Sequence, residues 1–327
     1  MAEGAAIPVV LQGLGPIGQA IGRAVLERPD LRIAAAVDPA HAGKSLAELL
    51  GPTAPPITIA ADVAKAYAAA RGGAVLHATS SSFEAVLPQL QRAVDAKLAV
   101  ISTCEELAWP WLRAPEAADA LDARAEAKDV AVLGVGVNPG FVLDRLPVFL
   151  AQVTGAVRHV RALRVVDAAA RREGLRRKVG FGLDEDAFLA AADDGKVGHV
   201  GLAESAALVA AGCGFEIDEY EDEIEPVVAD EDFAGPPAVR RGQVVGARQV
   251  VRGFAEGAER VRLELEISVH ADDPRDEVEL DAQPPVRAVV KGGIAGDLAA
   301  AWAVVNAVPA VLEMRGLVTV LDLPAGR

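Results

Sequence analysis

IPVVLQGLGPIG, at residues 7–18, joins a short apolar run to a glycine-rich turn. Residues 7–11 are continuously apolar and include β-branched side chains, which is typical of a buried strand. Ile17, Ile21 and Val25 then follow four residues apart, which predicts a helix with one apolar face. The glycines fall in the order Gly-x-Gly-x-x-Gly between strand and helix, which is the context that the dinucleotide-binding fingerprint requires.

Each glycine of this turn has a physical reason. Gly13 permits the tight turn, Gly15 lets backbone approach a pyrophosphate, and Gly18 lets the helix pack closely on the strand. The pyrophosphate would lie at the positive end of the helix, where Pro16 and Ile17 begin it. The alternative is a purely structural glycine-rich turn.

Asp38 lies 20 residues beyond Gly18, at the end of a second apolar strand over residues 33–37. Its carboxylate can accept hydrogen bonds from the adenosine ribose hydroxyls and would repel a 2′-phosphate, which favours NAD as the cofactor. His41 and Lys44 are close enough in sequence to reach a phosphate, so NADP remains the alternative.

Strands and helices keep alternating as far as about residue 138. Further strands are predicted at 74–78, 98–101 and 130–133, with helices at 83–95 and 115–128 between them. This order predicts an α/β Rossmann fold with a doubly wound parallel sheet.

The pattern then changes to that of an α+β domain. Val261, Leu263, Leu265 and further apolar residues alternate with charged ones, which is the signature of a half-buried antiparallel strand. We expect a Rossmann domain over residues 1–140, completed by a C-terminal helix in about residues 296–327. Residues 141–295 would form the second domain, with an open mixed or antiparallel sheet.

Composition excludes several classes of function. The 47 acidic residues against 32 basic ones give a net charge of −15, which argues against a nucleic-acid or anionic-membrane partner. The N-terminus lacks the basic region of a signal peptide, so a cytoplasmic protein is expected. Two cysteines, Cys104 and Cys213, cannot form a disulfide framework, and no metal-binding spacing occurs, so no metal is expected.

Three of the predicted strands end in polar clusters, at residues 77–82, 102–106 and 138–140. Ligands of open α/β sheets bind at the carboxyl ends of strands. Hydroxyl groups of Thr79 and Ser80 suit the nicotinamide ribose, and the Asn138 amide matches a carboxamide. The predicted cofactor contacts from these clusters are His77, Thr79, Ser80, Ser102, Thr103, Cys104, Asn138 and Pro139.

Some of these residues have structural alternatives. Ser81 and Ser82 fit helix N-capping better than ligand binding. Pro139 and Gly140 fit the crossing between the two domains. Cys104 has no evident histidine partner, so we interpret its side chain as a small packing residue rather than a nucleophile.

Glu105 and Glu106 are the candidates for the catalytic carboxylate. A carboxylate beside a nicotinamide can act as a general base or hold a cationic nitrogen. An acid at a helix N-terminus is the alternative for both residues and fits Glu106 better. The residues alone do not decide between them.

Two stretches of like charge stand out. Residues 216–232 hold ten carboxylates and no Lys or Arg, and residues 158–178 hold eight basic residues against two acids. They can be solvated faces, or complementary surfaces of a homodimer.

The segments 13–18, 102–110, 136–141, 198–205 and 292–297 together resemble the 2,4-diaminopentanoate dehydrogenases. These are relatives of the native amine dehydrogenases, within a wider dihydrodipicolinate-reductase-like group. The resemblance covers nearly the whole chain. The Thr-Cys-Glu-Glu and Asn-Pro-Gly-Phe segments are specific to it, whereas the glycine fingerprint is not.

The resemblance implies an NAD(P)-dependent amine dehydrogenase with ammonia and a small ketone or amine as substrates. It implies that the second domain covers the nicotinamide and mediates homodimerisation, and that the essential glutamate is Glu105. Arg161, Arg164 or Arg171 could bind a substrate carboxylate. The substrate pocket expected from the resemblance and from apolar character, with core packing as the alternative for each residue, comprises Phe141, Val142, Phe181, His199 and Trp302.

Two other functions remain as alternatives. The first is an NAD-dependent reductase of ketones or preformed imines, which would not depend on ammonia. The second is a non-catalytic nucleotide-binding sensor, which would keep Gly13, Gly15, Gly18 and Asp38 but would not need Glu105.

Overall fold

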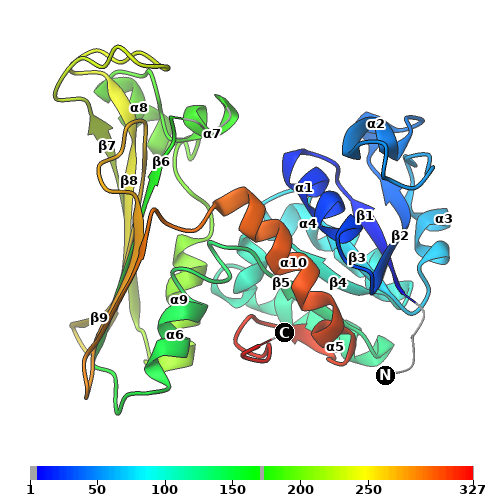
Figure 1. Cartoon of the computed structure of the whole chain (residues 1–327). Helices are drawn as coiled ribbons and strands as arrows, with labels where there is room; N and C mark the ends of the chain where they lie inside the picture. The colour runs from blue at the N-terminus through cyan, green and yellow to red at the C-terminus, as the bar shows by residue number, and fades with distance from the viewer. Residues whose placement is uncertain (1–5, 170–172, 327) are drawn as a thin grey trace. The chain divides into compact units, whose positions relative to one another are not determined.

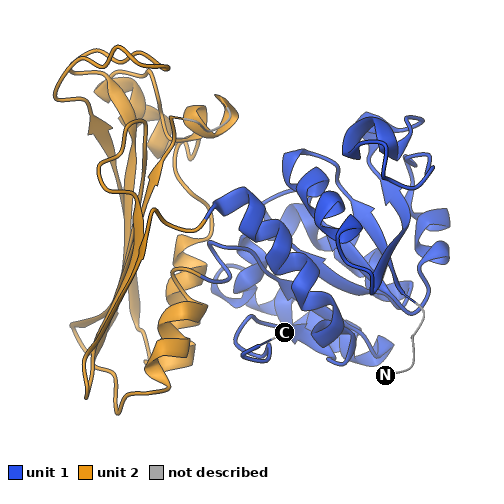
Figure 2. Ribbon diagram, viewed as in Figure 1, with its two compact units in different colours: residues 1–141, 295–327 blue, residues 142–294 orange. Residues whose placement is uncertain are grey.

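The computed structural model describes residues 6–169 and 173–326 and divides into two compact units (Figure 2). Unit 1 comprises Met1–Phe141 and Ala295–Arg327, and unit 2 comprises Val142–Ile294. Within the described residues, no helix is long and apolar enough to cross a membrane.

Unit 1 is built on a six-stranded parallel sheet with the order β12-β5-β4-β3-β1-β2 (Figure 1). Its strands are β1 (Ile7–Gln12), β2 (Leu31–Val37), β3 (Ala74–His77), β4 (Ala99–Ser102), β5 (Ala131–Gly134) and β12 (Gly316–Val318). The order reverses at β1, which pairs with β2 on one side and β3 on the other. The carboxyl ends on either side of β1 form the topological switch point where open α/β sheets bind ligands.

Helices cover both faces of this sheet. They are α1 (Pro16–Leu26), α2 (Leu46–Leu50), α3 (Val63–Ala69), α4 (Phe83–Asp95), α5 (Pro115–Lys128) and α10 (Gly296–Leu312), with the short 3-10 helices η1 (Pro39–His41), η2 (Glu106–Ala108) and η3 (Pro110–Leu112). Val75, Val100 and Val132 are fully buried in one core with residues of α3, α4 and α5. Leu76 and Ile101 alternate with them and face the opposite way, toward the side where α1 and α10 pack together.

Unit 2 holds a six-stranded mixed sheet with the order β11-β10-β6-β9-β8-β7. Its strands are β6 (His159–Asp167), β7 (Glu219–Val228), β8 (Val244–Ala255), β9 (Ala258–Ser268), β10 (Arg275–Asp281) and β11 (Val286–Lys291), and its helices are α6 (Arg145–Ala151), α7 (Glu173–Lys178), α8 (Glu185–Asp193) and α9 (Leu202–Cys213). β6 and β9 run parallel, and the other neighbouring pairs are antiparallel. α6 and α9 pack on one face (Figure 1). The Rossmann sheet and the open mixed sheet predicted from the sequence are both confirmed.

The other face of the unit 2 sheet carries paired charges. Glu264 is 2% exposed and accepts hydrogen bonds from Arg161 at 2.7 Å, Arg262 at 3.1 Å and Arg248. Burial by itself would raise the pKa of Glu264, but the three guanidinium groups outweigh it and lower that pKa to about 2. On β7, Glu221 pairs with Arg252 at 3.1 Å. The acidic and basic stretches marked in the sequence therefore both contribute to ion pairs within the chain.

A buried ion pair holds the end of unit 2. Arg164 and Asp276 are 4% and 1% exposed, and a guanidinium nitrogen lies 3.0 Å from a carboxylate oxygen. Arg164 also donates to the carbonyl oxygen of Ile294 at 2.6 Å, and the Ile294 amide donates to Asp276 at 2.7 Å. Burial raises the pKa of Asp276, and the Arg164 charge opposes that rise. Both backbone groups of the last residue of unit 2 are thus fixed by one ion pair.

We expect Asp276→Asn to lower the free energy of unfolding by about 3 kcal/mol or more, because it leaves the buried Arg164 charge uncompensated. Asp281→Asn is the matched control. Asp281 also lies on β10 and pairs with Arg158, but these two side chains are 54% and 57% exposed. Its loss should cost about 1 kcal/mol or less. Urea denaturation measures both variants, and equal losses would contradict this account of the buried pair.

Candidate active site

The turn between β1 and α1 needs two of its glycines for its own packing. Gly13 has a φ of 87°, and a Cβ there would lie 2.4 Å from the carbonyl oxygen of Ala78. A Cβ at Gly18 would lie 1.9 Å from the carbonyl oxygen of Gly13. Any side chain at these positions would collide with backbone, so the turn, α1 and the end of β3 approach one another only because these residues are glycine.

The packing of the turn itself does not require a glycine at position 15. Its φ of −64° suits any residue, and a Cβ there would meet nothing within 4 Å. It is the N-cap residue of α1, where no side chain caps the helix and Pro16 and Ile17 form the first turn. The missing Cβ leaves room outside the protein, directly at a helix N-terminus. This geometry fits a pyrophosphate held by backbone N–H groups, so the residues present suit a dinucleotide cofactor.

Asp38 connects the end of β2 to the same turn. One carboxylate oxygen accepts a hydrogen bond from the Leu14 amide at 2.6 Å, and the other accepts one from the Ala40 amide at 2.8 Å. These bonds fix the carboxylate, and each oxygen has a further lone pair that can accept from a ribose hydroxyl. A negative charge is therefore fixed beside the glycine turn.

His77 and Ser102, at the ends of β3 and β4, point into the protein. They are 1% and 0% exposed, and the His77 Nδ1 lies 2.8 Å from the Ser102 Oγ. The His77 Nε2 lies 2.9 Å from the Oγ1 of Thr79, which is exposed, as is Ser80. Burial lowers the pKa of His77 to about 4, so the ring is neutral at physiological pH. Direct cofactor contacts by these residues remain a prediction.

Two glutamines that the sequence analysis did not select join this network. Gln12 donates to the Oε1 of Gln89 at 2.8 Å, and that oxygen lies 3.2 Å from the His77 Nε2. Gln12 ends the otherwise apolar strand β1, and a polar residue at the end of an apolar strand was the signal in the sequence that could have identified it. In the structure its side chain is 6% exposed. Gln89 gave no comparable signal, because it lies within the amphipathic helix α4.

The structure separates the two glutamates. The Glu106 carboxylate accepts a hydrogen bond from the Phe83 amide at 2.7 Å, at the N-terminus of α4. Ser82 is the N-cap residue of α4, but its hydroxyl makes no capping bond, so the prediction that this side chain caps the helix was wrong. A carboxylate beside a helix N-terminus is stabilised by the helix dipole, and here it replaces the serine. Glu106 thus binds the N-terminus of α4. The preceding residue, Glu105, is half-buried, like Thr103 and Asn138.

Glu105 is held on a well-packed segment. Cys104, Leu107 and Ala108 are each at most 2% exposed. A Cβ on Gly134 would lie 2.6 Å from the carbonyl carbon of Leu107, so the end of β5 touches this backbone directly. Glu105 therefore stands at the carboxyl edge of the sheet on a backbone that packing fixes from below.

Cys104 is a packing residue, as predicted. Burial raises the pKa of its thiol to about 12, and the thiol donates to the carbonyl oxygen of Ser81 at 3.2 Å. The raised pKa favours the protonated thiol over the thiolate that a nucleophilic cysteine needs. Thr103, just before it, is half-buried, and its amide donates to the His77 carbonyl at 3.0 Å.

The turn after β5 is equally tight. The Val135 amide donates to the carbonyl of Ser102 at 2.8 Å, and the Asn138–Pro139 peptide bond is cis. Gly140 has a φ of 124°, and a Cβ there would lie 2.4 Å from the amide nitrogen of Gly136. The turn therefore places half-buried Asn138 at the same edge of the sheet as Glu105, since β4 and β5 are parallel neighbours.

The predicted substrate residues are divided between the units. Phe141, 38% exposed, and Trp302 on α10 belong to unit 1, and Val142, Phe181 and His199 belong to unit 2. Val142 is fully buried, and the Arg176 guanidinium lies 6.0 Å from the centre of the Phe181 ring. Their role in binding substrate remains a prediction.

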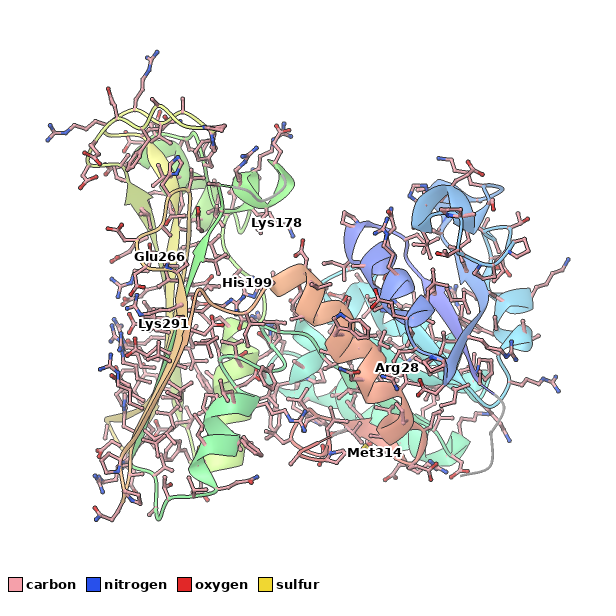
Figure 3. All side chains as sticks on the ribbon, in the orientation of Figure 1. Arg28, Lys178, His199, Glu266, Lys291 and Met314 are labelled. Carbon is pink, nitrogen blue, oxygen red and sulfur yellow. The ribbon has the colours of Figure 1, made fainter. Side chains whose placement is uncertain are left out.

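His199 lies just before α9 (Figure 3). Its backbone amide donates to the Oε1 of Gln249 at 2.9 Å. Gln249 in turn donates to Asp222 at 2.9 Å, so strands β7 and β8 hold the loop that carries the histidine.

The arginines considered for a substrate carboxylate are engaged elsewhere. Arg161 binds Glu264, and Arg164 binds Asp276, while Arg171 lies outside the described residues. Among the residues that the structure describes, no group of three or more His, Cys, Asp or Glu side chains is arranged to hold a metal ion.

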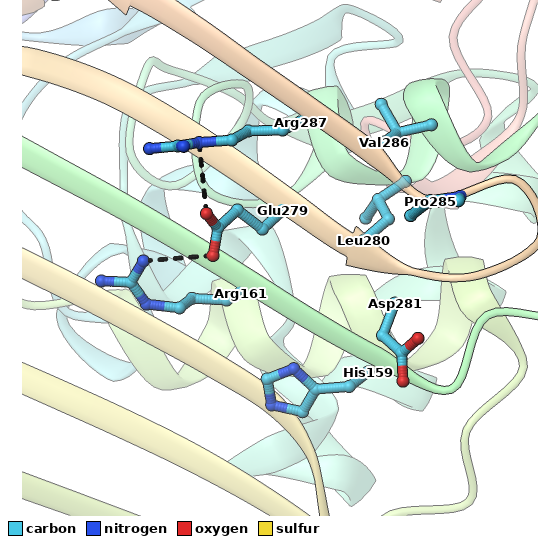
Figure 4. A pocket seen from close by; sticks show the side chains of 8 residues that line it. All are labelled: His159, Arg161, Glu279, Leu280, Asp281, Pro285, Val286 and Arg287. Carbon is cyan, nitrogen blue, oxygen red and sulfur yellow. Dashed lines mark hydrogen bonds and ion pairs between the residues drawn. The ribbon is translucent and has the colours of Figure 1, made fainter.

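A hollow in unit 2 is lined by Arg161, one of the arginines considered for a substrate carboxylate, and by none of the predicted catalytic or cofactor-binding residues (Figure 4). Its lining includes Arg161 and Arg287, both paired with Glu279 at 3.3 and 3.2 Å. These two arginines are thus paired with a carboxylate of the same hollow.

Comparison with known proteins agrees with this geometry. Residues 141–327 match the family described as 2,4-diaminopentanoate dehydrogenase C-terminal domain. A curated 2,4-diaminopentanoate dehydrogenase from Acetoanaerobium sticklandii is 27% identical over 261 residues, which cover 77% of this chain and 74% of that relative.

Solved structures share the fold. An amine dehydrogenase from Mycobacterium smegmatis has a TM-score of 0.85 at 19% identity, covering 100% of this chain and 98% of that one. The WlbA (WbpB) dehydrogenase from Thermus thermophilus, solved with NAD and UDP-GlcNAcA, has a TM-score of 0.53 at 17% identity, covering 95% and 90%. The family match spans more than half of the chain and confirms the resemblance noted in the sequence. The chain belongs to the 2,4-diaminopentanoate dehydrogenase family of oxidoreductases.

Proposed function

We propose that this chain is a nicotinamide-dependent amine dehydrogenase that deaminates an amine oxidatively and, in reverse, aminates a ketone or oxo-acid with ammonia. The observation that carries the proposal is the position of Glu105. It stands partly exposed at the carboxyl edge of the parallel sheet, on the backbone segment that directly follows β4, and its neighbour Glu106 binds the N-terminus of α4. The names of the relatives from Acetoanaerobium and Mycobacterium support the same reaction.

The cofactor site would use the turn, Asp38 and the strand ends. Backbone at Gly15 and the N-terminus of α1 would hold the pyrophosphate, and Thr79, Ser80 and Asn138 would face the nicotinamide end. Asp38, fixed by two backbone amides, would accept the ribose hydroxyls and repel a 2′-phosphate, which favours NAD.

NADP is the alternative cofactor. The Nδ1 of His41, just beyond Asp38, is buried and makes no hydrogen bond within the described part of the chain. That nitrogen, with the exposed Lys44, supports a test of NADPH beside NADH.

In the amination direction, ammonia adds to the ketone carbon, water leaves, and an iminium ion forms. Glu105 takes a proton from the ammonium ion, gives it to the hydroxyl group of the adduct as that group leaves as water, and as a carboxylate again stabilises the positive charge of the iminium. A bound nicotinamide would supply the hydride that reduces the iminium to the amine. The packed backbone beneath Glu105 keeps its carboxylate in place during these steps.

We also propose that the chain forms a homodimer. The charged face of the unit 2 sheet carries both arginines and glutamates, such as Arg287 and Glu279, which pair within the chain, and a self-complementary face of this kind suits the contact of two identical copies about a two-fold axis. Light scattering at several concentrations checks the mass, and a monomer throughout would overturn the proposal.

The experiment that tests the function is NADH oxidation with cyclohexanone, 4-oxopentanoate and 2-amino-4-oxopentanoate, with and without ammonium at alkaline pH. Ammonium-dependent turnover is the expected result, and the same panel with NADPH reports the cofactor preference. Turnover without ammonium would mean reduction of the ketone itself. NADH binding without any turnover would favour the sensor.

We expect Glu105→Gln to lower the amination rate by about 10²–10⁴-fold, because the amide cannot accept the proton. NADH affinity, measured by fluorescence titration, should stay the same. Glu106→Gln is the matched control and should mainly lower stability, by about 1 kcal/mol, since an amide oxygen is a weaker acceptor for the Phe83 amide. Equal loss of amination in both variants would refute the assignment of Glu105.

We expect Gly15→Ala to weaken NADH binding by about tenfold or more, or about 1.4 kcal/mol, because the new methyl group occupies the pyrophosphate position. Its stability should change by about 1 kcal/mol or less, since the Cβ meets no atom within 4 Å. Gly18→Ala should instead unfold unit 1, because of the 1.9 Å contact. Unchanged NADH affinity in Gly15→Ala would count against the cofactor site.

A further inference from the structure

A chain of hydrogen bonds crosses the interior of unit 1 and ends beneath Glu105. It begins on α3, where the Tyr67 hydroxyl donates to the Oε1 of Gln12 at 2.6 Å. Gln12 donates to Gln89 at 2.8 Å, and Gln89 lies 3.2 Å from the Nε2 of His77. The chain thus connects α3, β1, α4 and β3.

The partners fix the protons of the His77 ring. The Gln89 amide oxygen can only accept, so its contact at 3.2 Å assigns hydrogen to the Nε2 of His77, and the Thr79 Oγ1, 2.9 Å from the same nitrogen, can accept from it as well. The tautomer assigned from these partners is Nε2–H, and Nδ1 is an acceptor. The Ser102 hydroxyl then donates to Nδ1 at 2.8 Å, and its oxygen accepts from the Cys104 amide at 3.1 Å. With this tautomer, a donor and an acceptor are assigned in each of the hydrogen bonds that join Gln89, His77, Ser102 and Cys104.

The hydrogen bond from the Ser102 hydroxyl to the Nδ1 of His77 requires a neutral imidazole ring. Burial lowers the pKa of His77 to about 4, so Nδ1 keeps its lone pair throughout the neutral and alkaline range. A protonated ring would donate from Nδ1 and would force the Ser102 hydroxyl away from it. The neutral ring can therefore accept the Ser102 hydroxyl proton, while the Ser102 oxygen accepts from the Cys104 amide.

We propose that His77 and Ser102 are positioning residues that set the backbone of Thr103 and Cys104, and through it the carboxylate of Glu105. The proposal rests on the proposed function. Neither side chain reaches the surface, since they are 1% and 0% exposed, so they act through the backbone and not on substrate. The other ring nitrogen binds the Thr79 hydroxyl at 2.9 Å, so one imidazole orders both the Glu105 segment and the strand end after β3.

The test compares Ser102→Ala, His77→Asn and Tyr67→Phe. Ser102→Ala removes the acceptor of the Cys104 amide, and we expect a loss in the kcat of amination of about 10–100-fold, with the KM for NADH unchanged within about threefold. His77→Asn keeps an acceptor near the Nδ1 position for the Ser102 hydroxyl. Its kcat of amination should therefore stay within about fivefold of the wild-type value.

Tyr67→Phe is the matched control. It removes a hydrogen bond at the far end of the same network, where Tyr67 is 5% exposed and its hydroxyl donates to Gln12. It should lower stability by about 1 kcal/mol and leave kcat unchanged. If Tyr67→Phe lowers kcat as much as Ser102→Ala, the network is merely structural and the proposal is overturned.

Hydrogen exchange gives a readout that does not need turnover. The amides of residues 103–107 should exchange about tenfold faster in Ser102→Ala than in the wild type or Tyr67→Phe. If Ser102→Ala does not fold, the same comparison is made between His77→Leu and His77→Asn. A wild-type enzyme without ammonium-dependent turnover would refute the proposed function alone. Equal exchange in all the variants would refute the positioning role.

Discussion

The structure of unit 1 depends on backbone contacts too close for any side chain. At Gly13, Gly18 and Gly134 a Cβ would lie 1.9 to 2.6 Å from a main-chain atom of another segment. These contacts bring the turn after β1, the end of β3 and the segment after β4 to one edge of the sheet. A backbone approach of this kind gains dispersion contacts and hydrogen bonds along the whole edge, but it tolerates no methyl group. The cofactor turn and the Glu105 segment are therefore parts of one packed layer.

Polar side chains at this edge serve two purposes. His77, Ser102 and Glu106 point inward or along the protein and fix the backbone. Thr79 and Ser80 are exposed, and Glu105 is partly exposed. A buried, hydrogen-bonded layer beneath these groups holds their backbone rigidly, because a polar group that leaves its partner in a low-dielectric interior costs free energy. The edge of the sheet thus keeps its geometry through the buried groups His77 and Ser102.

Local patterns in the sequence were enough for the fold, because each depends on neighbouring residues. The glycine turn, the alternation of strand and helix and the alternating residues of β9 each predicted an element that the structure contains. Contacts between distant residues could not be predicted. Glu106 caps α4 in place of Ser82, by accepting from the amide of Phe83, which lies 23 positions earlier in the sequence. The pairing of Arg164 with Asp276 spans 112 positions, so an arginine considered for substrate proved to be a structural residue.

The discontinuity of unit 1 has a consequence for synthesis on the ribosome. Residues 142–294 form unit 2 as one continuous stretch, whereas α10 and β12 of unit 1 are synthesised only after unit 2. Until then β5 is an edge strand with an unpaired side, because its outer partner is β12. Unpaired strand edges are sites of aggregation. The nascent chain thus completes its cofactor-binding sheet last, and truncation near residue 295 would leave a folded unit 2 attached to an open sheet.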